Sequence, residues 1–380
     1  MLNETYRAML GNKSVIRETF MYGKKRAAEI GCENVFDYSL GNPSVPCPPE
    51  FTAAMQDLLA NEEPVNLHGY CPSQGDPGFR TDVAAHLTKT FGLPYEQKHI
   101  FPTTGAAGAI AHAIRAVTQP GDEVLTFAPY FPEYGPYVAG TGAVLKVVPP
   151  QAPTFQPNLD AFEQMIGEKT TCVLINTPNN PTGRVIRREL MEAILEKCRA
   201  AGIRLVVDEC FLALSDGGEE ASLAGYLEQY PNLLLLRAFT KSYAMPGLRL
   251  GYCLSADTAL LDRLSRCAQP WSVSGPAQAA GLAAAAEPLH PLLARQLIAP
   301  ERSWLTQAME GLGLRVFPSA ANYLLFRAPG VSDLKERLLG RGVLIRSCAN
   351  YPGLGEDYYR VAVRLRGENE RLIQAMKEVL

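Results

Sequence analysis

The sequence contains no pair of cysteines in a C-x-x-C spacing, although it has nine cysteines in 380 residues. They are scattered from Cys32 to Cys348, and their number is odd. This pattern indicates neither a disulfide framework nor a zinc knuckle, and no metal site is predicted. Cysteine usage of this kind fits a reducing environment, so we expect a cytoplasmic protein.

Long basic runs and long hydrophobic runs are also lacking. With 36 Lys and Arg against 39 Asp and Glu, the formal net charge is -3, which offers no electrostatic footprint for nucleic acid. The N-terminus has no basic segment followed by an apolar core, and the most apolar helical stretch, residues 277–286, is far too short to cross a bilayer. We therefore expect neither a nucleic-acid partner nor a membrane anchor.

Two nucleotide-binding signatures and any internal repeat are missing as well. The glycine loop at residues 104–108 is not G-x-G-x-x-G, and no Walker pattern occurs. What remains is an ordinary globular composition, with 47% hydrophobic and 20% charged residues. The length allows two domains or one large α/β body.

The first residues and the last third differ from the middle of the chain. Residues 1 to about 36 predict a polar helix, which we interpret as an N-terminal arm, and the proline-rich segment 37–49 predicts a loop. After about residue 270 an alanine-rich helix (277–286) and a helix around 303–312 are expected, followed by a smaller set of strands and helices. The predicted units are 1–45 (arm and part of a small domain), 46–275 (large domain) and 276–380 (C-terminal small domain).

Short apolar strands alternate with helices from about residue 99 onward. This pattern predicts an α/β fold whose mostly parallel sheet is covered by helices on both faces. The expected strands are 99–102, 123–127, 172–176, 203–207 and 232–237, and the expected helices are 105–117 and 189–201.

One lysine directly follows the last of these strands. Lys241 comes after the run N-L-L-L-L-R at residues 232–237, which predicts a buried strand. A lysine held partly neutral by desolvation or by neighbouring cations can capture a carbonyl group. The alternative is a solvated surface lysine, because lysines are rarely buried.

Further polar residues follow other strands, at the edge where sheets of this kind bind ligands. Gly105, with Ala106 and Ala107, lies between a strand and a helix, where backbone amides can meet a phosphate, although a plain turn also favours glycine. Asn180 lies in the turn N-T-P-N-N-P-T-G, which an ordinary proline turn would also explain. Asp208 ends a predicted buried strand, where a carboxylate is costly to desolvate unless a cation pairs with it.

One cofactor requires a phosphate site, a lysine for its aldehyde, a carboxylate for its pyridine nitrogen and an aromatic ring to stack on. That cofactor is pyridoxal phosphate. Across nearly its whole length the chain resembles the fold-type I pyridoxal-phosphate enzymes of aminotransferase class I/II. The resemblance implies a large domain with a mostly parallel sheet between helices and a smaller α+β domain.

The resemblance assigns roles residue by residue. Lys241 matches the Schiff-base lysine, Asp208 the partner of the ring nitrogen and Asn180 the amide that bonds the ring hydroxyl. Gly105, Ala106 and Ala107 match the phosphate loop, Arg249 the phosphate-binding arginine and Phe131 the ring-stacking aromatic. Tyr70 matches the tyrosine lent to the neighbouring subunit's phosphate, which implies a homodimer, although a packed aromatic is the alternative.

Substrate contacts are implied in the same way. Arg360 matches the arginine that clamps the α-carboxylate, although it could instead be an exposed strand residue. Asn42 and Asn322 are further candidate substrate contacts. Two positions depart from the family's usual pattern: Phe211 stands where many members have a tyrosine, and Ala238 where many have a phosphate-binding Ser or Thr.

The second half of the chain is similar to histidinol-phosphate aminotransferases and threonine-phosphate decarboxylases. In that branch Arg346 would help to hold a substrate phosphate, although a domain-surface arginine is the alternative. We predict an aminotransferase acting on an amino acid, phosphorylated or acidic, and a 2-oxo acid. The alternatives are a decarboxylase of the threonine-phosphate type and a non-catalytic ligand-sensing protein of the same fold.

Overall fold

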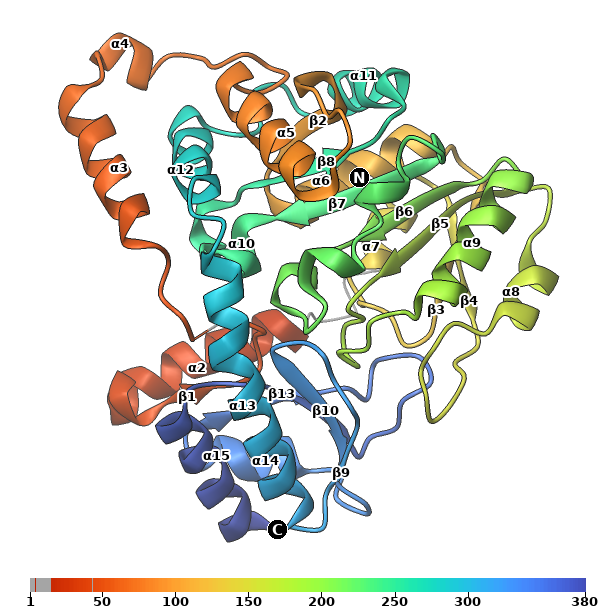
Figure 1. Ribbon diagram of the computed structural model, residues 1–380. Coiled ribbons are helices and arrows are strands. Elements are labelled where there is room, and N and C mark those ends of the chain that lie inside the picture. Colours follow the sequence, from red (N-terminus) through yellow and green to blue (C-terminus); the bar gives the residue numbers. More distant parts are fainter. Residues whose placement is uncertain (1–3, 5–14, 43) are drawn as a thin grey trace.

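The computed structural model of the protein describes residue 4, residues 15–42 and residues 44–380. A seven-stranded sheet with helices around it forms the upper part of Figure 1, and a four-stranded sheet lies below it. The α/β architecture with a mostly parallel sheet, predicted from the sequence, is confirmed.

The large sheet has the strand order β2-β8-β7-β6-β5-β3-β4. Only β8 runs antiparallel to its neighbours, and all other pairs are parallel. The five expected strands are present, with β4 and β8 in addition. The strands are β2 (Ile100–Thr103), β3 (Glu123–Phe127), β4 (Val144–Val148), β5 (Thr170–Asn176), β6 (Arg204–Asp208), β7 (Leu233–Ala238) and β8 (Gly251–Leu254).

Both faces of this sheet are buried, which explains why its strands are apolar throughout rather than alternating. In β6, Leu205 and Val207 join a core on one face, and Val206 joins a second core on the other. The first core is completed by α5 (Pro77–Phe91), α8 (Leu159–Met165), α9 (Arg188–Ala200) and α12 (Gly275–Ala285). The second is completed by α6 (Gly105–Val117), α7 (Tyr134–Ala139) and α11 (Thr258–Cys267).

The small sheet is antiparallel, in the order β12-β13-β10-β9. Its strands are β9 (Arg315–Val316), β10 (Tyr323–Arg327), β12 (Arg346–Ser347) and β13 (Tyr358–Ala362), and a separate core joins it to α13 (His290–Glu310), α14 (Leu334–Leu339) and α15 (Arg366–Val379). β1 (Phe36–Asp37) pairs in parallel with β11 (Val343–Leu344), and this brings the N-terminal segment to the C-terminal elements (Figure 1).

Two expected helices have different bounds. The N-terminal helix α2 (Val15–Ile30) ends before residue 36, because Gly31 takes a φ of 90° and a short 3-10 turn leads into β1. The part of that prediction covering residues 1–3 and 5–14 lies outside the described residues. The helix expected around 303–312 is the second half of α13, which continues through Pro300 because Ala294, Ile298 and Leu305 all pack on the core.

The remaining helices are α3 (Pro49–Asn61), α4 (Pro64–Leu67) and α10 (Phe239–Ser242). The large sheet falls within predicted residues 46–275 and the four-stranded sheet within 276–380, but the domain boundaries themselves stay predictions. Within residue 4 and the segments 15–42 and 44–380, no helix has the length and apolar character needed to span a membrane.

Candidate active site

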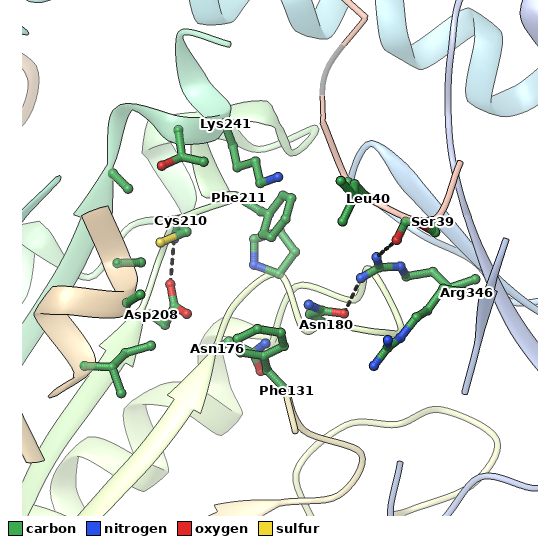
Figure 2. Close-up of a pocket in the computed structure, with 18 of the residues that line it drawn as sticks. Ser39, Leu40, Phe131, Asn176, Asn180, Asp208, Cys210, Phe211, Lys241 and Arg346 are labelled. Atoms are coloured by element: carbon green, nitrogen blue, oxygen red, sulfur yellow. Dashed lines mark hydrogen bonds between the residues drawn. The ribbon is translucent and has the colours of Figure 1, made fainter. Parts of the chain in front are cut away.

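A cavity of about 230 Å³ opens at the carboxyl ends of β5, β6 and β7, and residues of the small sheet line its other side (Figure 2). Asn176 ends β5, Asp208 ends β6 and Lys241 lies in α10, directly after β7. Parallel strands place their carboxyl ends at one edge, so residues far apart in sequence converge here. Asp208 and Arg346 lie on opposite sides of the cavity, with Lys241 between them.

The Lys241 amine lies inside this cavity. Its Nζ donates a hydrogen bond of 2.9 Å to Asn42 Oδ1 and lies 5.2 Å from the centroid of the Phe211 ring. Burial lowers the pKa of Lys241 to about 7, and the positive charges of Arg360 and Arg249 act in the same direction. Near neutral pH, a large share of this amine is therefore neutral and nucleophilic.

Asp208 is held by two donors at the end of β6. Tyr134 Oη donates to Asp208 Oδ2 at 3.2 Å, and the Cys210 backbone amide donates to Oδ1 at 3.0 Å. Burial raises the pKa of Asp208, and hydrogen bonds from Cys210 and Tyr134 oppose that shift. Tyr134 was not among the residues predicted from the sequence, because no local pattern marks a contact between residues 74 positions apart.

Arg346 and Arg360 face each other as register partners across β12 and β13. The Arg360 guanidinium donates to Asn180 Oδ1 at 2.5 Å and to the Ser39 carbonyl at 2.6 Å. Arg346 is only 2% exposed, and its Nε and Nη1 have no hydrogen-bond partner. Among the described residues, no carboxylate forms a salt bridge with either arginine. The cavity thus contains two buried positive charges that no described carboxylate neutralises, and such a pair is suited to binding an anion.

The N-terminus of α6 meets Arg249 at another side of the cavity. Gly105 has a φ of +68°, and a Cβ there would lie 2.9 Å from Arg249 Nη2. Thr104 makes no side-chain capping bond to the helix, so the first amide groups of α6 are not occupied by a side chain at that position. Ala106, Ala107 and Arg249 line the cavity, and this corner is suited to an anion such as phosphate.

Aromatic and small residues complete the wall. Phe131 lines the cavity and meets the Tyr134 ring edge-on at 5.8 Å. Phe211 also lines it and packs against Tyr323, with 5.1 Å between ring centroids. Ala238 offers no hydroxyl, but Thr240 lines the same cavity two residues further on.

Gly105 and Asn42 adjoin the cavity through Arg249 and Lys241 without lining it, and two further predicted site residues, Tyr70 and Asn322, lie away from it. Tyr70 is 85% exposed and packs against Trp271 with the two rings tilted and their centroids 4.7 Å apart. Asn322 is fully buried behind the cavity, where its Nδ2 donates to the Gly41 carbonyl at 3.1 Å. Neither contributes to the cavity wall of the described chain.

Fold and cavity define a fold-type I enzyme with a buried lysine of lowered pKa at the carboxyl edge of its central sheet. The chain belongs to the family "Aminotransferase class I and II", whose model matches residues 33–376. The predictions of this family and of an aminotransferase enzyme are therefore confirmed.

Two different enzyme activities are named among the relatives. A histidinol-phosphate aminotransferase from Anaeromyxobacter sp. is 32% identical over 355 residues, which cover 93% of each chain. A threonine-phosphate decarboxylase from Salmonella typhimurium is 38% identical over 254 residues, or 66% of this chain and 69% of that protein.

Solved structures agree in fold. An aminotransferase from Eubacterium rectale is 30% identical, with a TM-score of 0.83 over 100% of this chain and 98% of the other. An aspartate aminotransferase from Thermotoga maritima has a TM-score of 0.87 over 99% of each chain at 24% identity, which supports the fold alone.

Proposed function

We propose that this aminotransferase uses pyridoxal phosphate, held at the edge of the large sheet, to move an amino group between an amino acid and a 2-oxo acid. The single observation that carries the proposal is the Lys241 amine, whose pKa is lowered to about 7 by burial and two arginines, in one cavity with Asp208, Asn180 and Phe131. When bound, the cofactor supplies an aldehyde that captures amines and a ring that accepts electrons from the substrate Cα.

The residues at the α6 corner fit the phosphate of this cofactor. The Cβ-free Gly105 lets Arg249 approach the start of α6, where Ala106 and Ala107 leave the backbone amides accessible. We assign Thr240 the hydroxyl that Ala238 lacks, because both line the cavity.

The other walls fit the ring. Asp208 would hold the ring nitrogen protonated, Phe131 would cover a ring face, and the Asn180 amide would donate to the ring hydroxyl while its oxygen stays bonded to Arg360. Because phenylalanine has no hydroxyl, Phe211 would donate no second hydrogen bond to the ring hydroxyl of the cofactor.

The paired arginines determine the class of amino donor. Arg360 is suited to the substrate α-carboxylate, and Arg346, with two unpartnered nitrogens, is suited to a second anionic group. A donor with an acidic or phosphorylated side chain supplies both charges. Asn42, which bonds Lys241, would contact the substrate near the reacting centre, and Asn322 would support it from behind through Gly41.

The chain's own part in the chemistry is proton movement. The neutral Lys241 amine would take and hold the proton from the substrate Cα, while Arg360 would fix the carboxylate and so orient that Cα–H bond. Asp208 would serve as the counter-ion that keeps a ring nitrogen protonated.

Borohydride reduction of the purified protein followed by peptide mass spectrometry tests the cofactor assignment. A pyridoxyl group on the peptide that contains Lys241 is the expected result. Absence of that adduct, from protein that was first incubated with pyridoxal phosphate, would overturn the proposal.

A second reaction, decarboxylation, is favoured by the relative with 38% identity, a threonine-phosphate decarboxylase. The two reactions differ in which Cα bond breaks, and a panel of donors that includes histidinol phosphate and threonine phosphate separates them. A keto product together with pyridoxamine phosphate indicates transamination, and carbon dioxide indicates decarboxylation.

We also infer a homodimer in a reducing, cytoplasmic setting. Tyr70 and Trp271 form an exposed aromatic patch away from the cavity of the same subunit. In a dimer, Tyr70 would reach the phosphate site of the neighbouring subunit from this position. All nine cysteines are free thiols, in keeping with a reducing compartment.

A further inference from the structure

The loop between β12 and β13 carries a buried aromatic side chain into the cavity. Tyr351 is 2% exposed and lines the cavity together with Arg346. The Arg346 guanidinium carbon lies 5.6 Å from the centroid of the Tyr351 ring. A cation over an aromatic face is attracted by the ring's quadrupole, most strongly where water is excluded.

Contacts with the segment after β4 and with the residues near β9 hold this loop in place. Tyr351 packs in a small core with Phe155, from the segment after β4, and with Phe317, near the start of the small sheet. Gly353 has a φ of +85°, and a Cβ there would lie 2.6 Å from Pro150. The backbone amide of Tyr351 donates to the Cys348 carbonyl at 3.0 Å, which closes a tight turn. The ring is therefore fixed by groups from both halves of the molecule.

Arg346 depends on this ring for its position. Its Nε and Nη1 make no hydrogen bond, no described carboxylate pairs with it, and its register partner on β13 is another arginine. A long arginine side chain with few polar restraints loses much rotamer entropy when it is fixed. The aromatic face can hold the guanidinium while Nε and Nη1 remain unpartnered, so these two donors stay available to a ligand.

We propose that Tyr351 is a specificity-determining residue: its ring positions Arg346 so that the enzyme selects ligands with a second anionic group beyond the α-carboxylate. This inference rests on the proposed function, because it assumes that Arg360 takes the carboxylate of the same ligand. Tyr351 acts through Arg346 and takes no part in proton transfer.

Two non-reactive ligands test the proposal on the pyridoxal-phosphate-loaded enzyme by calorimetry. 3-Phosphoglycerate has a carboxylate and a phosphate but no amine, and lactate has only the carboxylate. We expect Tyr351→Leu to weaken 3-phosphoglycerate binding by about tenfold and lactate binding by less than about twofold. Tyr351→Phe, which keeps the ring, should retain most of the 3-phosphoglycerate affinity.

Tyr358→Leu is a matched control. Tyr358 packs against the same small core and has the Arg327 guanidinium 5.7 Å from its ring, but it does not line the cavity. This variant should leave the ratio of the two affinities unchanged. In an Arg346→Met background, Tyr351→Leu should have no further effect on 3-phosphoglycerate.

Equal weakening of both ligands by Tyr351→Leu would indicate a purely structural role and overturn the inference, as would unchanged 3-phosphoglycerate binding. Failure of the proposed function looks different. In that case the wild-type protein forms no pyridoxyl adduct at Lys241 and discriminates between the two ligands no better than the Arg346→Met variant does.

Discussion

The Lys241 amine shares its cavity with the guanidinium groups of Arg360 and Arg249, and no carboxylate hydrogen-bonds to it among the described residues. Burial is the largest cause of its lowered pKa, and the two arginines add to it. The Asn42 oxygen accepts from the amine whether or not it is charged, so it orients the lysine without requiring the protonated form.

The rate at which apoprotein captures pyridoxal phosphate should follow this pKa. Capture requires the neutral amine, so the rate should rise with pH, with a midpoint near the Lys241 pKa of about 7, and level off above it. Stopped-flow absorbance across a pH series measures it. Arg360→Gln removes a positive neighbour and should move the midpoint upward.

Arg327→Gln serves as the control for that shift, because Arg327 pairs with Asp357 away from the cavity. A midpoint near the ordinary lysine value in the wild type, or an equal shift in both arginine variants, would contradict the prediction.

Tyr134→Phe should weaken the electron-accepting state of the cofactor ring. Without the Tyr134 hydroxyl, Asp208 loses one of the bonds that oppose the upward pKa shift caused by burial, so its proton affinity rises. The proton should then shift from the ring nitrogen toward Asp208. We expect kcat to fall about tenfold, as for loss of a hydrogen bond to a charged group, with little change in KM.

Nitrogen NMR of the loaded enzyme with ¹⁵N-labelled cofactor reports the position of that proton directly. Tyr130→Phe is the matched control, since Tyr130 stacks on Tyr134 at 6.3 Å without a bond to Asp208. If the ring-nitrogen signal is the same in Tyr134→Phe and in the wild type, the assigned role of Tyr134 is wrong.

At the scale of single elements, the start of α6 shows how a helix end and a distant arginine form one site. Gly105 takes a left-handed backbone conformation, and Arg249 does so as well, with a φ of 54°. These two backbone conformations bring the Arg249 guanidinium against the first residues of α6. There, the positive charge of the arginine and the helix dipole both favour an anion.

Gly105→Ala should harm this site beyond the strain of the backbone. An alanine with positive φ costs roughly 1–2 kcal/mol of stability, and the new Cβ would also displace Arg249. Gly202→Ala provides the comparison, because Gly202 has the same φ of +68° with nothing within 4 Å of the added Cβ.

Both variants should lose similar thermal stability, but only Gly105→Ala should weaken pyridoxal phosphate binding, by about tenfold or more. Fluorescence titration of the apoproteins measures the affinity. Equal cofactor affinity in the two variants would contradict a phosphate site at this helix end.

At the scale of the whole molecule, α13 and the β1–β11 pair connect the two sheets. α13 contacts both α10, which carries Lys241, and α15 of the C-terminal core. β1 leads directly to Ser39 in the cavity wall and to Asn42, which bonds Lys241, so the N-terminal segment reaches the site only because it pairs with a strand some 300 positions later. The cavity is therefore built from segments that lie far apart in the sequence.

The proposed dimer predicts complementation between inactive subunits. Co-expressed Lys241→Ala and Tyr70→Ala subunits should form mixed dimers in which one site has both native residues, restoring about a quarter of wild-type activity for random pairing. Each variant alone should be much less active. Light scattering establishes whether dimers form, and activity that stays at the level of the separate variants would contradict the sharing of Tyr70.

The sequence by itself determined the α/β class, five of the seven strands of the large sheet and the family. These signals are local: apolar runs such as residues 233–236 are buried on both faces, and the polar residues follow where parallel strands end. The tertiary structure decided which polar groups meet. The opposition of Arg346 and Arg360, the bond from Tyr134 to Asp208 and the Tyr351 ring under Arg346 join positions whose spacing carries no pattern, because register and packing between distant segments set them.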